Sequence, residues 1–488
     1  MTDEPGDAVF EPIRTMIRRE LVERALPSLA VGVARGGTIV WEEGFGWADR
    51  ERRVEATPHT LYSLASISKP ITATGLMVLV ERELIDLDHP IDEYLGDAKL
   101  NARTGKAAEA TVRRVANHTA GLPLHYQFFY ADEPYHRPPM DETIRRYANL
   151  VTPPGERWMY SNLGYGLLDY VIERLGRRSY AEWMRREVFL PLGMLHASVG
   201  IGPGLEAFAA QRYGADGVAY PHYDFDHPGG SAVYSSVHDL LRFALFHLKE
   251  HLPDQRAIVP DAAIDAMQVP TGRRDDTRGY GIGWDVNEDE RGYHTVGHHG
   301  GMGGVHTTLV MVPSERIAVV ALANAAGDLP HRVAADILGL LLPRYAERLA
   351  EEQKQGKEEN AKKEQATFKP PRKLQGEWRG SVHTYAGDVP LVLRFKKDGD
   401  VHARLGKQLT ALVNDPTFED ERIGGVMIGT LPTEDVNRRR LDLRLDLRLR
   451  GRTIDGALVA HTDNDEEGGA PGQRVGNGLS HWTELRKA

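Results

Sequence analysis

The chain has 488 residues, of which 41% are hydrophobic and 27% are charged, and its formal net charge is −10. This balance is typical of a globular protein with sizeable cores, and it argues against nucleic acid and anionic membranes as main partners. The absence of cysteine excludes disulfides, thiolate metal sites and a cysteine nucleophile.

The N-terminal residues lack the basic segment and apolar run of a secretory signal, and no stretch reaches about 18 apolar residues. We therefore expect a cytoplasmic protein without a membrane span. A chain trimmed of its signal would instead be periplasmic or secreted.

Hydrophobic spacing in the first two thirds of the chain predicts strands at both ends and helices between them. Strands are expected over residues 29–34, 38–41, 305–312 and 317–322, and helices over 10–24, from Ser66 onward and over 333–342. Regular alternation of strands and helices, the sign of a parallel sheet, is not seen. The expected fold class is α+β, with an antiparallel sheet built from both ends of this region and a helical insertion.

Composition changes over residues 347–369, where a charged run without an apolar face predicts a solvated helix or a flexible linker. The remainder reads as all-β. Its segment 441–449 alternates strictly, and the Asp and Arg face of that strand is interpreted as a solvated barrel exterior in preference to a binding face. We expect a first domain over 1–345, a charged linker over 346–371 and a C-terminal β-barrel domain over 372–488.

The most informative motif is Ser66-Ile67-Ser68-Lys69. Positions i and i+3 share one face of a helix, so the serine Oγ and the lysine Nζ can come within hydrogen-bonding reach. A serine beside an amine that takes its proton is an activated nucleophile. Taken alone, the motif is also compatible with an ordinary surface helix.

A second motif is Tyr160-Ser161-Asn162. A phenol has a reference pKa near 10, and a nearby lysine ammonium would lower it, so Tyr160 beside Lys69 could shuttle the serine proton. The amide of Asn162 offers a donor and an acceptor for holding an amide or ester substrate. The alternative for this motif alone is a turn with a packed aromatic ring.

A third motif is the glycine-rich run from Gly297 to Gly304, which contains His298 and His299. Glycines let a backbone approach a ligand closely, and an N–H on such an edge can bind an oxyanion. Adjacent histidines, and the set His222, Asp224, Asp226 and His227, have the composition of metal ligands. They lack the spacing of a helical histidine pair, so we expect no metal and no cofactor, and a polar loop at residues 222–227.

Together, the three motifs resemble the serine β-lactamase and penicillin-binding-protein superfamily, in particular the class C β-lactamase branch with its esterase and D-aminopeptidase relatives. The resemblance covers about residues 31–324 and extends to the stretches 117–123, 191–194 and 228–230. It implies a β-lactamase/transpeptidase-like domain, in which helices flank an antiparallel sheet and form a further subdomain. Gly376-Glu377-Trp378 resembles the opening of a lipocalin-like barrel.

The resemblance also implies roles for individual residues. Ser66 would be the nucleophile, Lys69 its proton partner, and Tyr160 the general base for acylation and the acid for the leaving group. The oxyanion hole would be formed by the N–H groups of Ser66 and Gly301, and substrate would contact Asn162, His298 and Gly300.

His298 stands where the family often carries a lysine, which supplies a permanent cation for a substrate carboxylate. A histidine is mostly neutral at neutral pH. We therefore expect weak turnover of β-lactams, better activity on esters or small amides, and tighter binding of carboxylated substrates at lower pH.

The sequence thus predicts a cofactor-free serine hydrolase that forms an acyl-enzyme with a small-molecule ester, amide or peptide. Carboxylesterase is the first choice, with a D-amino-acid peptidase, an amidase or a β-lactamase as alternatives. A different class is a non-catalytic protein that binds a cell-wall or peptide ligand. The barrel would gate the site, build a homo-oligomer or pack inertly, and the aromatic loop 127–139 would line the pocket or pack.

Overall fold

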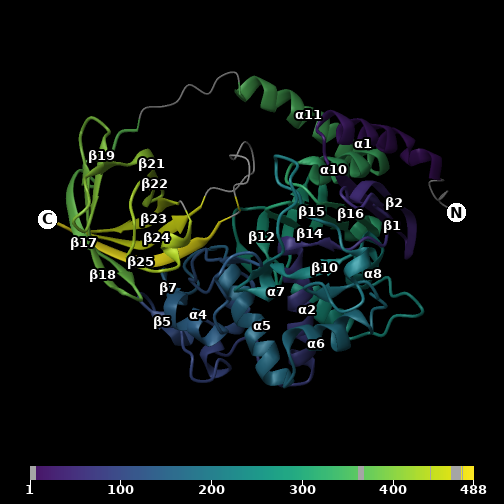
Figure 1. Ribbon diagram of the computed structural model, residues 1–488, viewed down its shortest axis with the longest axis horizontal. Coiled ribbons are helices and arrows are strands. Elements are labelled where there is room, and N and C mark those ends of the chain that lie inside the picture. The colour runs from purple at the N-terminus through teal and green to yellow at the C-terminus, as the bar shows by residue number, and fades with distance from the viewer. Residues whose placement is uncertain (1–6, 361–367, 440, 463–473, 475) are drawn as a thin grey trace.

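The computed structural model describes residues 7–360, 368–439, 441–462, 474 and 476–488. Figure 1 shows a larger part with helices around a sheet and, beside it, an all-β part that holds the C-terminus. Within the described ranges, no helix combines the length and apolar character that crossing a membrane requires.

The larger part is built on a nine-stranded sheet in the order β11-β12-β13-β14-β15-β16-β1-β2-β3, with antiparallel neighbours. Its strands are β1 (Ser28–Arg35), β2 (Thr38–Asp49), β3 (Val54–Glu55), β11 (Gly272–Arg273), β12 (Arg278–Tyr280), β13 (Asp285–Glu290), β14 (Tyr293–Met302), β15 (Val305–Val312) and β16 (Ile317–Ala323). Because β1 pairs with β16, the expected sheet with strands from both ends of this region is confirmed.

Helices cover both faces of this sheet, which explains why every residue of β16 is buried. Alternate residues of a strand point to opposite faces. Val319 and Ala321 therefore pack toward α1 (Glu11–Glu23) and α10 (Leu329–Leu341), whereas Val320 joins the core on the other face. On that face α8 (Val237–His247) lies so close to β1 that a Cβ at Gly32 would be 2.5 Å from Val237 Cγ1.

The inserted helices surround α2 (Ser68–Glu81), whose residues are buried from Ser68 to Leu79. The 3₁₀ turn η2 (Ala65–Ile67) precedes α2, so the helix predicted from Ser66 begins with this tighter turn. The other helices here are α3 (Val112–Ala116), α4 (Met140–Tyr147), α5 (Asn162–Gly176), α6 (Tyr180–Met184), α7 (Pro228–Ser231) and α9 (Asp261–Met267).

Short strands tie the insertion together. They are β4 (Tyr62–Ser63), β8 (Ser198–Val199) and β10 (Val233–Ser235) in one sheet, β5 (Asn101–Ala102) and β7 (Asn149–Leu150) in a second, and β6 (Phe128–Tyr130) and β9 (Tyr223–Phe225) in a third. Phe128 and Tyr130 are buried among aromatic side chains of β9. The start of the loop 127–139 is therefore a packed element.

The charged segment after α10 forms the helix α11 (Pro343–Asn360), while residues 361–367 of the predicted linker lie outside the described residues. An antiparallel sheet follows in the order β20-β19-β18-β17-β25-β24-β23-β22-β21. Its strands are β17 (Gly376–Thr384), β18 (Gly387–Phe395), β19 (Val401–Leu405), β20 (Ala411–Leu412), β21 (Asn414–Glu419), β22 (Arg422–Met427), β23 (Asp442–Arg450), β24 (Thr453–His461) and β25 (Gly478–Lys487).

The two edge strands of this second sheet, β20 and β21, are consecutive along the chain and separated only by Val413. The sheet must therefore curl until its edges meet, which gives a nearly closed barrel (Figure 1). The predicted fold class, α+β followed by a C-terminal all-β barrel, is confirmed.

The barrel packs directly on the larger part. Val151 and Met159 form an apolar cluster with Trp482, Val459 and a neighbouring alanine of the barrel. At the same boundary the backbone groups of Tyr126 and Gly478 exchange two hydrogen bonds of 2.9 Å.

Strand β23 adds ion pairs to this boundary. Arg450 Nη2 lies 2.6 Å from a carboxylate oxygen of Glu156, and Arg448 Nη1 lies 3.4 Å from the same oxygen. Arg157 in turn lies 3.5 Å from Asp446. The interpretation of this polar face as a solvated barrel exterior was wrong here, because strict alternation identifies the two faces of a strand but not what covers them.

Replacing Arg450 by alanine removes both of its hydrogen bonds to Glu156. We expect a loss of about 1 kcal/mol in the free energy of unfolding, since this pair is only partly screened by water. Deuterium uptake, measured by mass spectrometry, should rise in residues 153–159. The exposed Arg404 on β19 is the matched control; equal uptake in R450A and R404A would contradict this contact.

Candidate active site

Ser66 lies in the turn η2, just before the buried helix α2, and is half-buried. The preceding residue, Ala65, has a φ of 49°, a left-handed conformation that is unfavourable for alanine. Backbone hydrogen bonds hold this turn, because Leu64 donates to Val233 and its carbonyl accepts from the Thr307 hydroxyl. The strained turn presents the serine hydroxyl at the start of an otherwise buried helix.

The side chain of Lys69 is buried, and its Nζ atom lies within hydrogen-bonding distance of three oxygens. These are Ser66 Oγ at 3.0 Å, Asn162 Oδ1 at 2.7 Å and the Gly230 carbonyl oxygen at 3.0 Å. The structure therefore brings together the predicted serine and lysine with the asparagine of the second motif. Gly230, whose carbonyl completes the set, is a contact that the sequence analysis missed.

Burial lowers the pKa of Lys69 well below its usual value, because the charged form loses its hydration. The carboxylate of Asp285 raises that pKa, but its effect is the smaller one. Nζ is placed to donate to all three oxygens. In the neutral form, which the lowered pKa favours, two N–H groups would serve the carbonyl-type acceptors and the lone pair would face the Ser66 hydroxyl. This arrangement suits an amine that removes a proton from the serine.

Tyr160 lies beside this pair: Lys69 Nζ is 4.8 Å from the centre of the tyrosine ring, and Ser66 acts on the phenol by lowering its pKa. Burial raises the pKa of Tyr160 above its usual value. The expectation that a lysine ammonium lowers this pKa was wrong, because the amine and the phenol are desolvated together. In this setting Tyr160 is a neutral phenol and a proton donor.

His118 holds the segment that carries Tyr160. Its Nδ1 accepts from the Ser161 backbone N–H at 3.1 Å, its carbonyl accepts from Met159 N–H at 2.7 Å, and its ring lies 4.4 Å from that of Tyr160. The Ser161 hydroxyl accepts from Gly164 N–H and caps α5, which begins at Asn162. The spacing of the Tyr160-Ser161-Asn162 motif does not identify this role of His118. The role depends on the backbone of His118, which has a left-handed φ of 64°.

The glycine-rich motif forms the second half of β14. Pairing of β13 with β14 ends at Asp285 and Gly297, so the stretch 298–302 is bordered by η2 instead. A Cβ at Gly300 would lie 2.2 Å from the Leu64 carbonyl oxygen, so only glycine allows this approach. The predicted oxyanion donors, Ser66 and Gly301, lie on these two adjoining segments.

His298 is buried, and both of its ring nitrogens have partners. Nδ1 lies 2.7 Å from the His299 carbonyl oxygen, so it carries the proton, and Nε2 accepts from the Tyr280 hydroxyl at 2.8 Å. Burial, the largest cause, lowers the pKa of His298 well below its usual value. This lowering disfavours the expected tighter binding of carboxylated substrates at lower pH, because His298 gains a charge only well below its usual pKa.

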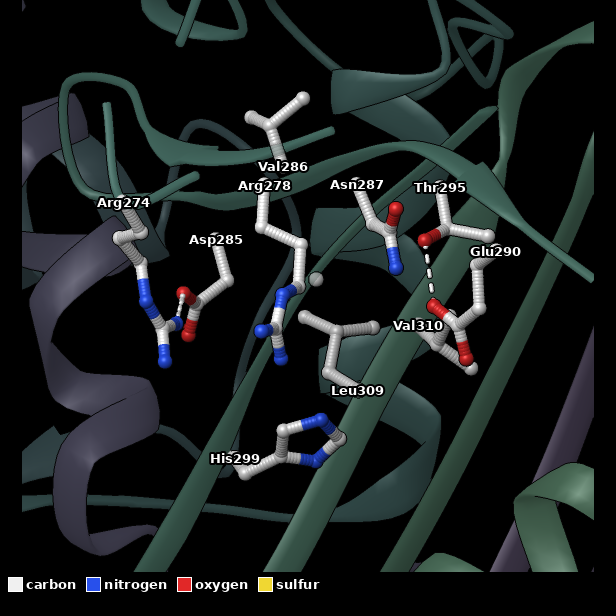
Figure 2. Close-up of a pocket in the computed structure, with 11 residues that line it drawn as sticks. Arg274, Arg278, Asp285, Val286, Asn287, Glu290, Thr295, His299, Leu309 and Val310 are labelled. Atoms are coloured by element: carbon white, nitrogen blue, oxygen red, sulfur yellow. Dashed lines mark hydrogen bonds and ion pairs between the residues drawn. The ribbon is translucent and has the colours of Figure 1, made fainter. Parts of the chain in front are cut away.

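His299 points to the opposite face of the strand, where Figure 2 shows it in a pocket of about 150 Å³. Arg274 lies 2.9 Å from Asp285 in this pocket, and Thr295 donates to Glu290. Since consecutive strand residues face opposite sides, the two adjacent histidines cannot share one metal ion. The site around Ser66 and this pocket lie on different sides of β14.

The segment 222–227 is divided between surface and core. His222 is exposed, whereas Asp226 is buried and lies 2.8 Å from His125 Nε2 and 2.5 Å from His227 Nδ1. His227 Nε2 lies 3.1 Å from Ser231 Oγ. The two histidines hold the pKa of Asp226 below its usual value despite burial. The expectation of a polar loop over this whole segment was wrong for Asp226 and His227.

The family model described as "Beta-lactamase" matches residues 13–342. Penicillin-binding protein 4* of Bacillus subtilis (strain 168) is 28% identical over 317 residues, which cover 60% of this chain and 67% of that protein. Protein flp of Staphylococcus aureus (strain MRSA252) is 23% identical, and the match covers 64% of this chain and 62% of flp, less than two thirds of that protein.

One solved structure, the octameric penicillin-binding protein homologue from Pyrococcus abyssi, superposes with a TM-score of 0.59 at 24% identity. It covers 91% of this chain and 97% of that one, so the shared fold reaches beyond the residues that the family model matches. Because the family model spans most of the chain and takes in the serine, lysine and tyrosine motifs, the chain belongs to the beta-lactamase family, within the superfamily of serine β-lactamases and penicillin-binding proteins.

Proposed function

We propose that this protein is a serine hydrolase that acts through an acyl-enzyme on small esters or amides, with Ser66 as the nucleophile. Membership of the family supports a general hydrolase role. The observation that carries the proposal is the buried Lys69 amine, 3.0 Å from Ser66 Oγ, with its other two contacts satisfied by acceptors.

In acylation, the neutral Lys69 amine takes the hydroxyl proton as Ser66 Oγ bonds to the substrate carbonyl carbon. The backbone N–H groups of Ser66 and Gly301 stabilise the oxyanion, and losing one such donor typically costs about 2.7–4 kcal/mol in the barrier. The Tyr160 phenol then protonates the leaving group and recovers a proton from the Lys69 ammonium. In deacylation the same proton transfers run in reverse with water as the nucleophile, and the carboxylic acid is released from Ser66.

This assignment revises the role predicted for Tyr160, which the resemblance makes the general base. The pKa of Tyr160 is raised and that of Lys69 is lowered by burial. The amine is therefore the better acceptor for the serine proton, and the phenol is the better donor to the leaving group.

Substrate selection is proposed to depend on Asn162, Gly300 and the neutral His298. A histidine whose two nitrogens are engaged supplies no cation for a substrate carboxylate. We therefore favour carboxylesterase-like activity with weak turnover of β-lactams.

A D-amino-acid peptidase or amidase is the second candidate. A solved structure titled "Crystal structure of SurE with D-Leu" covers 99% of this chain and 100% of its own, at 19% identity and a TM-score of 0.58. That protein shares the fold, barrel included, and its title names a D-amino acid. This likeness supports testing D-configured substrates beside simple esters.

We also propose the division into a catalytic domain over 1–345, a linker over 346–371 and a barrel domain over 372–488. The barrel contacts Glu156 and Met159, which lie four residues and one residue before Tyr160. We propose that it steadies the Tyr160 segment. A homo-oligomer is supported by the octameric homologue from Pyrococcus abyssi.

Replacing Ser66 by alanine should abolish covalent labelling by a fluorophosphonate probe, read by intact-protein mass spectrometry. Ser231 is the control, because its hydroxyl lies 3.1 Å from a histidine that contacts an aspartate and so is an alternative candidate for an activated serine. The S231A protein should still be labelled. Labelling that persists in S66A, or is lost only in S231A, would refute Ser66 as the nucleophile.

The pH dependence of ester kcat/KM should report the Lys69 amine. Activity requires its neutral form, so it is present above the Lys69 pKa and lost as pH falls through that value. Asp285 raises this pKa, so Asp285→Asn should move the acid limb to lower pH. Asp289→Asn, on the same strand, should leave the limb in place; a shift upward in D285N would contradict the assignment.

The Tyr160→Phe variant separates proton donation from nucleophilic attack. A p-nitrophenyl ester releases a leaving group that needs no proton, whereas a D-alanyl anilide releases an amine that does. We expect kcat for the anilide to fall about 10²-fold further than kcat for the ester. Equal losses on the two substrates, with the fold intact by circular dichroism, would instead support Tyr160 as the base in acylation.

A further inference from the structure

A cluster of metal-ligand side chains lies outside the residues used for hydrolysis. We propose that Glu42, His59 and His238 form a binding site for a divalent transition-metal ion such as Zn²⁺. One ligand atom from each residue lies within 4.8 Å of those of the other two. Imidazole and carboxylate are ligands that Zn²⁺ prefers, and three such groups leave one coordination position for water or another side chain.

The three residues come from different parts of the fold that backbone contacts already hold together. Glu42 is on β2, His59 is in the turn between β3 and β4, and His238 is in the first turn of α8. The His238 backbone N–H donates to the Pro58 carbonyl, and the rings of His59 and His238 are 4.9 Å apart. The site is therefore largely assembled before any ion binds.

The existing contacts set how far the ligands must move. His238 Nδ1 is 2.9 Å from Glu42 Oε2, a spacing that two ligands of one ion can adopt. Zn²⁺ ligands lie about 2.0–2.2 Å from the ion, so His59 must swing inward. Its ring is exposed and free to rotate at little cost in packing.

His196 is the candidate for a fourth ligand. Its ring lies 5.5 Å from that of His59, and its backbone N–H donates to Asp239 at 2.6 Å, which ties this loop to α8.

An ion at this position would join β2, the turn before β4 and the start of α8. None of these segments contains a residue proposed for hydrolysis. We therefore infer a structural role for the ion, with thermal stability as the property that it changes. The proposal does not depend on the proposed hydrolase activity.

The test adds ZnCl₂ to the metal-free 488-residue chain and measures binding by isothermal titration calorimetry and stability by thermal unfolding. We expect one bound Zn²⁺ per chain and a rise in Tm, since an ion that binds only the folded state stabilises it. His59→Ala and His238→Ala should each weaken binding at least tenfold and remove the rise in Tm. Glu42→Gln should weaken Zn²⁺ binding, because it removes the charge of the side chain while nearly keeping its size and shape.

His251→Ala is the matched control, because its side chain is 32% exposed against 30% for His238, and it is paired with a carboxylate, at 2.7 Å from Asp261. It should leave Zn²⁺ binding unchanged. Co²⁺ gives an independent readout, with visible absorption bands of a tetrahedral nitrogen and oxygen site in the wild type that are lost in H59A. The proposal is overturned if the wild type binds no Zn²⁺, or if H59A and H238A bind it as tightly as H251A does.

Discussion

The burial of one amine organises the centre of this protein. Lys69 reaches Ser66 in its own turn, Asn162 at the start of α5 and Gly230 in α7, so three segments distant in sequence meet at one nitrogen. Thr72, one turn further along α2, adds a hydrogen bond of 2.6 Å to the Gly229 carbonyl. A charged group at this position would lose its hydration, so the site favours the neutral amine and its lone pair.

Tyr160, the phenol beside this amine, is held in place by contacts from both the larger part and the barrel. His118 holds the backbone on either side of Tyr160, and Met159 packs against Trp482 of the barrel. The Tyr160 segment therefore packs between the helical insertion and the barrel. Glu156 and its two arginine partners on β23 fix the same segment from its other end.

Patterns in the sequence predicted those features that depend on local periodicity. The strand expected over 305–312 matches β15, and the strand expected over 317–322 lies within β16, because alternation of hydrophobic residues is a local signal. The pairing of Ser66 with Lys69 is also local, since one turn of helix brings them together. The contact of both with Tyr160 followed only from the resemblance to a family.

The sequence by itself determined the α+β order, the all-β C-terminal region and the presence of a hydroxyl, an amine and a phenol suited to one another. The tertiary structure decided their protonation, because pKa values depend on burial and on neighbours that sequence spacing does not reveal. The pKa of Tyr160 is raised, and the pKa values of Lys69 and His298 are lowered. It also decided that the polar face of β23 meets Glu156 and Arg157. A charged strand face looks the same in sequence whether water or a protein surface covers it.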